Sequence, residues 1–273
     1  MDKIFIDKLQ VFGRHGVMSE ENALGQMFYI SAELSLHLKA AGLSDSLENT
    51  VNYSDCCHLI KDICENNTFK LIETLAERTA YALLKHSPLI KAVKIRIDKP
   101  SAPIGLPLES VGVIMERQRE TAYIALGSNM GDKRAFLENA VKAIAGDENC
   151  RVCHVSDFIV TAPVSDIPQD DFLNGCMSVE TLYSPEELLD RLNAIEKAAD
   201  RVRTVKWGPR TLDLDIIFYG DRIIQTDRLT VPHPLAHKRT FVLEPLDQIA
   251  PFAVHPVLGK TVAALLDELK HEN

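Results

Sequence analysis

The stretch from Arg201 to Asp215 places four basic residues, one tryptophan and two carboxylates within fifteen positions. Asp213 and Asp215 alternate along an expected strand, so both project from one face while the apolar residues around them turn to the other. Carboxylates in this arrangement, with basic residues just upstream, suit Mg²⁺ held between protein oxygens and nucleotide phosphates. The alternative is an edge strand whose charged side chains form only salt bridges.

The basic residues of this stretch are Arg201, Arg203, Lys206 and Arg210, and Trp207 lies among them. They predict a segment that binds polyphosphate, because a guanidinium forms paired hydrogen bonds to phosphate that lysine cannot copy.

The net charge is −9, and residues 121–273 hold 16 basic against 23 acidic residues. A nucleic-acid-binding protein would spread positive charge over a face. A local basic cluster in an acidic half favours a small anion instead.

Composition is that of a globular protein, with 46% hydrophobic and 25% charged residues among 273, a length that favours two domains. No apolar run approaches the ~20 residues of a membrane span, and the first residues lack a signal-peptide pattern. We therefore expect a cytoplasmic protein without a membrane partner. The six cysteines show no disulfide spacing, and the lone pair Cys150 and Cys153 lacks the second ligand pair that structural zinc needs.

Periodicity predicts the elements that position these residues. In the first part of the chain, strands are expected from Ile4 toward Phe12 and over 28–38, 93–97 and 111–115, with two amphipathic helices before the last two strands. This ββααββ order predicts an antiparallel sheet with helices on one face.

In the second part, expected elements follow a βαββαβ order over 122–127, 135–146, 152–159, 175–182, 185–199 and 213–219. That order is typical of a ferredoxin-like plait. A loop-rich extension over 220–273, with a final helix near 261–270, completes the α+β chain. The polar run 116–120 separates the two parts and predicts domains over 1–119 and 120–273.

The stretch around Asp213 resembles the signature of 6-hydroxymethyl-7,8-dihydropterin pyrophosphokinases. The resemblance extends over residues 120–273 through the motifs Gly127-Ser128-Asn129-Met-Gly131-Asp132, Asp170-Asp171-Phe172-Leu173-Asn174, Leu229-Thr-Val-Pro-His233 and Arg239-Thr-Phe241. It implies transfer of pyrophosphate from ATP to the pterin, with two Mg²⁺ on Asp213 and Asp215.

The same resemblance assigns roles to individual residues. Arg201 and Arg210 correspond to phosphate-gripping arginines, and Asn174, Thr161 and Phe241 to pterin contacts. The implied ATP contacts are Asn193, Glu196, Arg203, Lys206, Trp207, Arg228, Thr230, His233 and Arg239. From the residues alone, the alternative for Phe241 is a core side chain. His233 and His237 do not predict zinc, because prolines flank His233 and prevent a regular helix.

Residues 1–119 resemble dihydroneopterin aldolases. The motifs are Phe12-Gly-Arg-His-Gly16, Ser19-Glu-Glu-Asn22, Thr50-Val-Asn-Tyr53, Leu71-Ile-Glu-Thr-Leu-Ala-Glu77 and Ile97-Asp-Lys-Pro100. The resemblance implies that Lys99 is a general acid–base without a Schiff base, and that Tyr53 and Glu21 position substrate and water. It places Glu73, Ile72 and Val51 in the pterin site. Read without the resemblance, Glu73 is an acidic residue in the first turn of a helix and Lys99 a solvated lysine.

Together the two resemblances imply a bifunctional enzyme of folate biosynthesis. Its substrates would be 7,8-dihydroneopterin, then 6-hydroxymethyl-7,8-dihydropterin and ATP, and its aldolase step would need no cofactor. Aldolases of this family place their active sites between the subunits of rings, so a homo-oligomer is implied. The alternative is an active pyrophosphokinase whose N-terminal part is a non-catalytic assembly domain or an epimerase.

Overall fold

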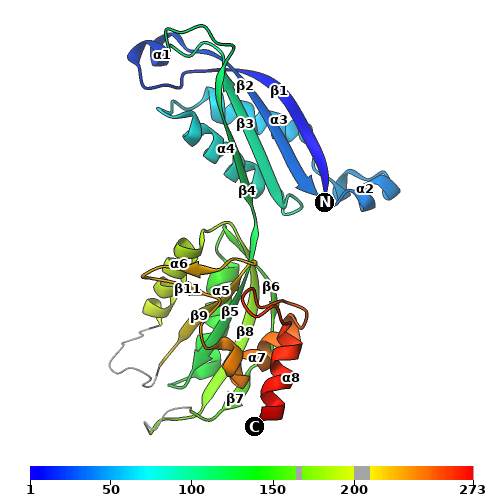
Figure 1. The fold of residues 1–273 in the computed structure, drawn as a ribbon, viewed down its shortest axis with the longest axis vertical. Coiled ribbons are helices and arrows are strands. Elements are labelled where there is room, and N and C mark those ends of the chain that lie inside the picture. Colours follow the sequence, from blue (N-terminus) through cyan, green and yellow to red (C-terminus); the bar gives the residue numbers. More distant parts are fainter. Residues whose placement is uncertain (164–167, 200–209, 273) are drawn as a thin grey trace. The chain divides into compact units, whose positions relative to one another are not determined.

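The computed structural model describes residues 1–163, 168–199 and 210–272 of the chain. Its internal contacts divide it into two units, Met1–Arg119 and Glu120–Asn273 (Figure 1). Both units mix helices and strands, which confirms the α+β class. Within the described ranges, no helix is both long enough and apolar enough to cross a membrane.

The first unit is a four-stranded antiparallel sheet in the order β1-β2-β3-β4, with the long helices α3 and α4 packed on one face (Figure 1). Fully buried side chains such as Phe28 and Leu34 from β2 and Leu75 and Leu83 from α4 form its core. The elements of this unit are β1 (Asp2–Gly13), α1 (Ser19–Leu24), β2 (Gln26–Leu36), α2 (Lys39–Ser44), η1 (Leu47–Asn49), α3 (Tyr53–Glu65), α4 (Ile72–His86), β3 (Ala92–Lys99) and β4 (Val111–Gln118).

Strand β1 changes the phase of its apolar alternation midway. Its less exposed residues include Ile4 and Ile6 in the first half but Leu9 and Val11 in the second. One extra residue therefore interrupts the alternation between Ile6 and Leu9. The structure has a β-bulge at this point, because the register with β2 shifts between Ile6 and Leu9 and Lys8 has a φ of +48°. The bulge keeps the apolar side chains of both halves on the same face.

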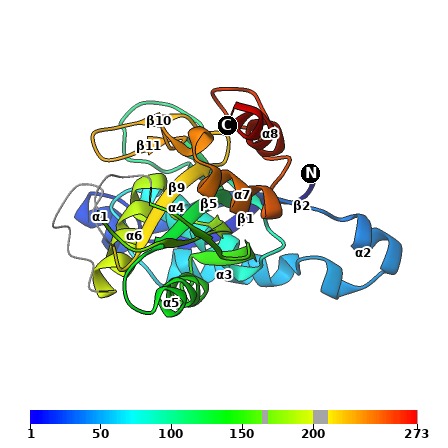
Figure 2. The same ribbon diagram turned by 90° about the horizontal axis from the view of Figure 1, so that it is seen from below.

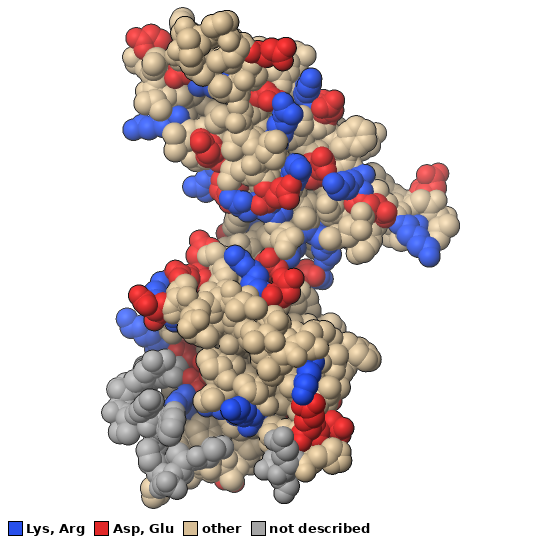
Figure 3. All heavy atoms as spheres, in the orientation of Figure 1, with Lys and Arg blue, Asp and Glu red and all other residues tan. Residues whose placement is uncertain are grey.

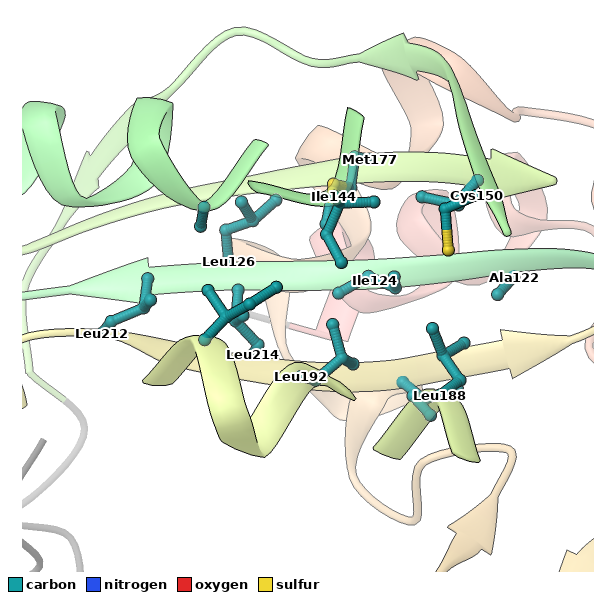
Figure 4. Packing of buried hydrophobic residues seen from close by; sticks show 14 of the residues in the cluster. Ala122, Ile124, Leu126, Ile144, Cys150, Met177, Leu188, Leu192, Leu212 and Leu214 are labelled. Atoms are coloured by element: carbon teal, nitrogen blue, oxygen red, sulfur yellow. The ribbon is translucent and has the colours of Figure 1, made fainter. Parts of the chain in front are cut away.

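The second unit is built on an antiparallel sheet in the order β6-β8-β5-β9, with β7 paired to β8. Helices α5 and α6 cover one face, where Ile144 and Leu192 pack against Ile124 of the central strand (Figure 4). Helix α6 begins with a capping box, in which Ser184 Oγ accepts from Glu187 N–H at 3.4 Å and Ser184 N–H donates to Glu187 Oε2 at 2.8 Å. The elements of this layer are β5 (Glu120–Ser128), α5 (Lys133–Ala145), β6 (Cys150–Val155), β7 (Ile159–Thr161), β8 (Phe172–Thr181), α6 (Pro185–Ala198) and β9 (Asp213–Tyr219).

The opposite face of this sheet is covered by α7 (Thr240–Ile249) and α8 (Val262–Glu272), so that α5 and α8 lie on opposite sides (Figure 2). The extension is thus more regular than expected, since the sequence predicts a helix only near 261–270. Pro245 lies inside α7 and costs a helix about 3 kcal/mol. Burial of Val242, Leu243 and Leu246 against the sheet offsets that cost. The extension also contains β10 (Ile224–Gln225), β11 (Thr230–Val231) and η2 (Ala236–Lys238).

Charged side chains are interspersed on the face that Figure 3 draws, where basic and acidic residues alternate over the described parts of each unit. Cross-strand ion pairs occur in both units. Lys94 Nζ lies 3.0 Å from Glu116 Oε1 in the first unit, and Arg151 Nη2 lies 2.8 Å from Glu180 Oε2 in the second. Exposed pairs of this kind stabilise a fold by at most about 1 kcal/mol each.

Candidate active sites

The second unit contains a cavity of about 340 Å³, lined by residues of β5, β8, β9 and the segment leading into α7. Gly127 of β5 lines the cavity between two neighbouring strands, because it pairs with Asn174 of β8 on one side and with Asp213 of β9 on the other. A Cβ at position 127 would lie 3.1 Å from Asn174 Oδ1. Because glycine has no side chain, the space between the Asn174 amide and the Asp213 carboxylate stays open.

One end of this cavity offers groups that suit a flat heterocycle. Asn174 is only 7% exposed, and its Nδ2 donates to Thr161 Oγ1 at 2.7 Å. The ring of Phe241 also lines the cavity, and the Arg239 guanidinium lies 5.6 Å from its centroid. A fixed amide beside an aromatic ring can bind a heterocycle by edge hydrogen bonds and stacking.

The other end holds the two predicted carboxylates. Asp213 and Asp215 both line the cavity, and the leucine and isoleucine that follow them on β9 are buried. Arg210 Nη1 forms an ion pair with Asp213 Oδ2. Within the described residues no group of three His, Cys, Asp or Glu could hold a metal ion. Two carboxylates in an open cavity nevertheless fit Mg²⁺, which commonly takes one or two carboxylates and fills its other positions with water and substrate phosphates.

Basic side chains line the same cavity as the carboxylates. Arg210, Lys238, Arg239 and His233 all line the cavity. Burial lowers the pKa of His233, and the nearby charge of Arg239 lowers it further. His233 Nδ1 accepts from Leu235 N–H at 3.2 Å, so the proton of the neutral ring resides on Nε2. The cavity can therefore bind an anion with cationic and neutral donors together.

Other predicted ATP contacts lie outside the cavity lining in the described part of the chain. Glu196 is 4% exposed and accepts from Leu214 N–H at 2.8 Å, so it fastens α6 to β9. Arg228 is exposed and pairs with Asp190 of α6. Asn193 and Thr230 are exposed. The predicted residues Arg201, Arg203, Lys206 and Trp207 lie outside the described residues.

The first unit contains a buried ion pair between the predicted residues Lys99 and Glu21. Lys99 ends β3 and Glu21 lies in α1, and both side chains are only 9% exposed. Lys99 Nζ donates to Glu21 Oε1 and, at 3.2 Å, to His15 O, and it lies 6.0 Å from the centroid of the Phe28 ring. A lysine held this rigidly beside a carboxylate can transfer protons at a defined position.

The loop after β1 holds this pair in place. His15 is 1% exposed, and its Nδ1 accepts from Phe69 N–H at 3.1 Å while Nε2 lies 3.4 Å from Cys64 Sγ. Gly16 has a φ of +154°, and a Cβ there would lie 2.2 Å from Glu21 Oε2. The glycine therefore gives the carboxylate room to reach Lys99.

Electrostatics favour the ionised form of Glu21. Burial alone raises the pKa of this carboxyl, but the hydrogen bonds from Lys99 and from Met18 N–H, with the charge of Lys99, lower the pKa below its usual value. The same surroundings act on His15, whose pKa is lowered by burial and, to a smaller extent, by Lys99.

The remaining predicted aldolase residues are not joined to this pair. Tyr53 opens α3 and is 64% exposed, and Glu73 is exposed in the first turn of α4. Val51 is buried and Ile72 is half-buried. Within the described first unit, neither Tyr53 nor Glu73 forms a hydrogen bond with Lys99 or Glu21.

Several residues of these sites are absent from the sequence-based prediction. They are His15 of the first unit and Asn129, Gln169 and Lys238 of the second. His15 and Asn129 belong to motifs that the prediction used, Phe12-Gly-Arg-His-Gly16 and Gly127-Ser128-Asn129. Their position in those motifs is the only signal, because their partners are distant in sequence.

Comparison with known proteins assigns each unit to a family. The family model described as 7,8-dihydro-6-hydroxymethylpterin-pyrophosphokinase matches residues 123–251. The model described as dihydroneopterin aldolase matches residues 4–116.

Individual relatives match either one unit or both. A 2-amino-4-hydroxy-6-hydroxymethyldihydropteridine pyrophosphokinase of Haemophilus influenzae is 46% identical over 50% of this chain and 85% of its own length. A folic acid synthesis protein of Pneumocystis carinii is 32% identical over 98% of this chain, which spans 38% of that relative. A crystal structure of E. coli dihydroneopterin aldolase in complex with neopterin is 31% identical and covers 43% of this chain and 99% of its own, with a TM-score of 0.40. The chain belongs to the 6-hydroxymethyl-7,8-dihydropterin pyrophosphokinase family, and its residues 4–116 match the dihydroneopterin aldolase model in the same polypeptide.

Proposed function

We propose that this chain catalyses two consecutive reactions of folate biosynthesis. Residues 1–119 would cleave 7,8-dihydroneopterin by a retro-aldol reaction into 6-hydroxymethyl-7,8-dihydropterin and glycolaldehyde. Residues 120–273 would then transfer pyrophosphate from ATP to the hydroxymethyl oxygen of that pterin, with release of AMP. The observation that carries the proposal is the convergence of Asn174, Phe241, Asp213 and Asp215 on one cavity beside cationic side chains.

One set of lining residues would bind the pterin and another set would bind ATP. Asn174, oriented by Thr161, hydrogen-bonds the pterin edge, and Phe241 stacks on its ring. Arg210, Arg239 and His233 bind the phosphates of ATP, and Arg210 exchanges its contact with Asp213 for a phosphate oxygen. Asp213 and Asp215 would hold Mg²⁺, proposed as two ions, which when bound neutralises the phosphates and aligns them for in-line attack.

Family resemblance alone supports a further set of ATP contacts. Arg201 is proposed as the second phosphate-gripping arginine. The other proposed contacts are Asn193, Glu196, Arg203, Lys206, Trp207, Arg228 and Thr230.

In the aldolase unit, Lys99 acts as general acid–base. As the free amine it receives the proton of the side-chain hydroxyl while the carbon–carbon bond breaks, and the imine of the dihydropterin ring takes up the electron pair of that bond. The protonated Lys99 then returns the proton to the side-chain carbon that remains on the ring, which gives the hydroxymethyl group. Glu21 holds the Lys99 amine in place and keeps its own charge, because its pKa is lowered. Glu73 binds the pterin edge, with Ile72 and Val51 beside it, and Tyr53 orients substrate and water. The buried Lys99–Glu21 pair favours a catalytic first unit over a non-catalytic assembly domain.

We also propose that the aldolase unit forms a homo-oligomer whose active sites lie between subunits. Among the described residues, the outer edges of β1 and β4 pair with no other strand, so each edge can pair with a neighbouring chain. Tyr53 and Glu73 are exposed and separate from the Lys99–Glu21 pair, as residues that serve a neighbour's site would be.

The finer fold assignments belong to the same proposal. The first unit would be a tunnelling-type fold, supported by its β1-β2-β3-β4 order with α3 and α4 between the hairpins. The second would be a ferredoxin-like plait, supported by the antiparallel order β6-β8-β5-β9 with α5 and α6 on one face.

The decisive experiment supplies dihydroneopterin, ATP and Mg²⁺ to the pure protein and follows glycolaldehyde and AMP together. The proposal predicts both products from dihydroneopterin and AMP alone from added 6-hydroxymethyl-7,8-dihydropterin. Release of AMP without glycolaldehyde would refute the aldolase assignment, and the reverse would refute the pyrophosphokinase assignment.

A further inference from the structure

Asn129 lies directly after β5 and is 2% exposed. It is not among the residues that line the cavity, but both the oxygen and the nitrogen of its side-chain amide form hydrogen bonds. Its Oδ1 accepts from Arg210 N–H at 2.7 Å, and its Nδ2 donates to Gln169 Oε1 at 2.9 Å and to Asp170 O at 3.2 Å. Its backbone N–H donates to Arg210 O at 3.1 Å.

The partners of Asn129 belong to the segments that lead into two different strands of the cavity wall, β8 and β9. Gln169 lines the cavity just before β8, the strand that carries Asn174 at the proposed pterin end. Arg210 lines it just before β9, the strand that carries Asp213 and Asp215 at the proposed phosphate end. One buried amide therefore joins the chain segments that lead into the two binding regions.

We propose that Asn129 is a positioning residue that sets the distance between the pterin and the phosphate-binding groups. This inference rests on the proposed pyrophosphokinase function and deepens it. The side chain of Asn129 holds the backbone of Arg210 and the side chain of Gln169. The pterin and ATP therefore bind at the separation that attack on the phosphate requires. Misplacement by about 1 Å at such a site costs on the order of a hundredfold in rate.

The chemistry of the amide explains why asparagine is needed. The position requires one acceptor facing a backbone N–H and two donors facing oxygen atoms. Aspartate keeps the acceptor but loses both donors and places a charge beside Asp170 O. Alanine loses all three side-chain bonds and leaves the partly buried Arg210 N–H without this partner.

The test compares Asn129→Ala and Asn129→Asp with the unaltered full chain. Steady-state measurements with Mg²⁺, ATP and 6-hydroxymethyl-7,8-dihydropterin give kcat and both KM values from AMP formation. Calorimetry with Mg²⁺ and α,β-methylene-ATP, in which the bond that must break is blocked, gives nucleotide affinity without turnover. Thr181→Val is the matched control, because Thr181 is a fully buried hydrogen-bonding residue at the far end of β8.

We expect Asn129→Ala to lower kcat at least about tenfold while each KM and the nucleotide Kd change less than about threefold. Adding Gln169→Ala to Asn129→Ala should cause little further loss, since the two residues would act through one contact. Thr181→Val should lower thermal stability and leave kcat intact.

A kcat within about twofold of the unaltered chain in both Asn129 variants would overturn the proposal. So would a rise in KM or Kd that accounts for the whole loss, or an equal loss of kcat in Thr181→Val. Asn129→Asp, which is isosteric, decides the question if the alanine variant does not fold. Failure of the proposed function itself is distinguishable, because the unaltered chain would then form no AMP.

Discussion

Glu21 and Lys99 lie 78 positions apart in the sequence, yet their side chains form a buried ion pair in the first unit. Each is 9% exposed, so water screens the pair little. Removal of one partner leaves the other as a buried charge without its counterpart, which typically costs about 3–5 kcal/mol. Loss of catalysis and loss of stability therefore have to be separated in any test of Lys99.

A double substitution separates them. Lys99→Met should abolish glycolaldehyde release and destabilise the unit, whereas Lys99→Met with Glu21→Gln should remain inactive but recover much of the stability, because no charge is left buried alone. Glycolaldehyde assays and thermal unfolding measure the two effects. Lys94→Ala, an exposed lysine on the same strand, is the control and should retain activity. Substantial aldolase activity in the double variant would contradict the role of Lys99.

Gly16→Ala should displace Glu21. The φ of +154° disfavours any side chain, and the new Cβ would fall 2.2 Å from Glu21 Oε2. We expect strain of about 1–3 kcal/mol and loss of glycolaldehyde release on the order of tenfold, with pyrophosphoryl transfer unchanged. Gly42→Ala, where no atom lies within 4 Å of the new Cβ, is the matched control. Equal activity in the two variants would show that Gly16 does not support the site.

Stability of the first unit should fall in mild acid because of His15. Burial lowers its pKa below 6.5, so below pH 6.5 the unfolded chain takes up a proton that the folded chain resists. Stability is then full above pH 6.5 and declines below it, by at most about 1.4 kcal/mol per pH unit for one proton. Pulse proteolysis in urea at pH 7.5 and 5.5, with fragments that report on each unit, measures this. The decline should be smaller in His15→Gln, and an unchanged decline would assign it to other groups.

The sequence best predicts those features that depend on residues close together in the chain. Asp213 and Asp215 are adjacent on one strand face, so alternation alone predicts that they project together, as they do. The family resemblance places Lys99 and Glu21 in one predicted site but does not predict their ion pair, because nothing in local periodicity brings α1 to the end of β3.

Other features depend on long-range packing that no local pattern reveals. Pro245 argues against a helix in the extension, yet burial against the sheet produces α7. Asn129 carries no distinguishing signal beyond its motif, since Gln169 and Arg210 approach it only in the folded chain.

Asp215→Asn should abolish AMP formation and leave glycolaldehyde release intact. An amide oxygen carries no charge to hold Mg²⁺ against the phosphates, so a loss on the order of a hundredfold or more is expected. Binding of Mn²⁺ in the presence of α,β-methylene-ATP, followed by electron paramagnetic resonance, should weaken in parallel. The control is Asp221→Asn, an exposed aspartate of the same unit that lies outside the cavity lining. Near-normal AMP formation by Asp215→Asn would refute the metal-binding role.

The last prediction concerns the assembly of the aldolase unit. Tyr53 and Glu73 are exposed and unconnected to the Lys99–Glu21 pair within one chain, so an active site between subunits would combine them from different chains. Tyr53→Phe and Glu73→Gln chains should each lose aldolase activity alone. Mixed by unfolding and refolding, they should recover part of it, provided that one site takes Tyr53 from one chain and Glu73 from another, because some sites then receive both intact residues.

Dilution tests the same arrangement without substitutions. Below the dissociation constant of the assembly, glycolaldehyde release should disappear before AMP formation, because the cavity of the second unit is lined by residues of that unit alone. Sedimentation velocity over the same concentrations shows whether dissociation accompanies the loss. A protein that sediments as a monomer throughout and still cleaves dihydroneopterin at its normal rate would contradict the proposed intersubunit site, and would require Tyr53 and Glu73 to approach Lys99 within a single chain.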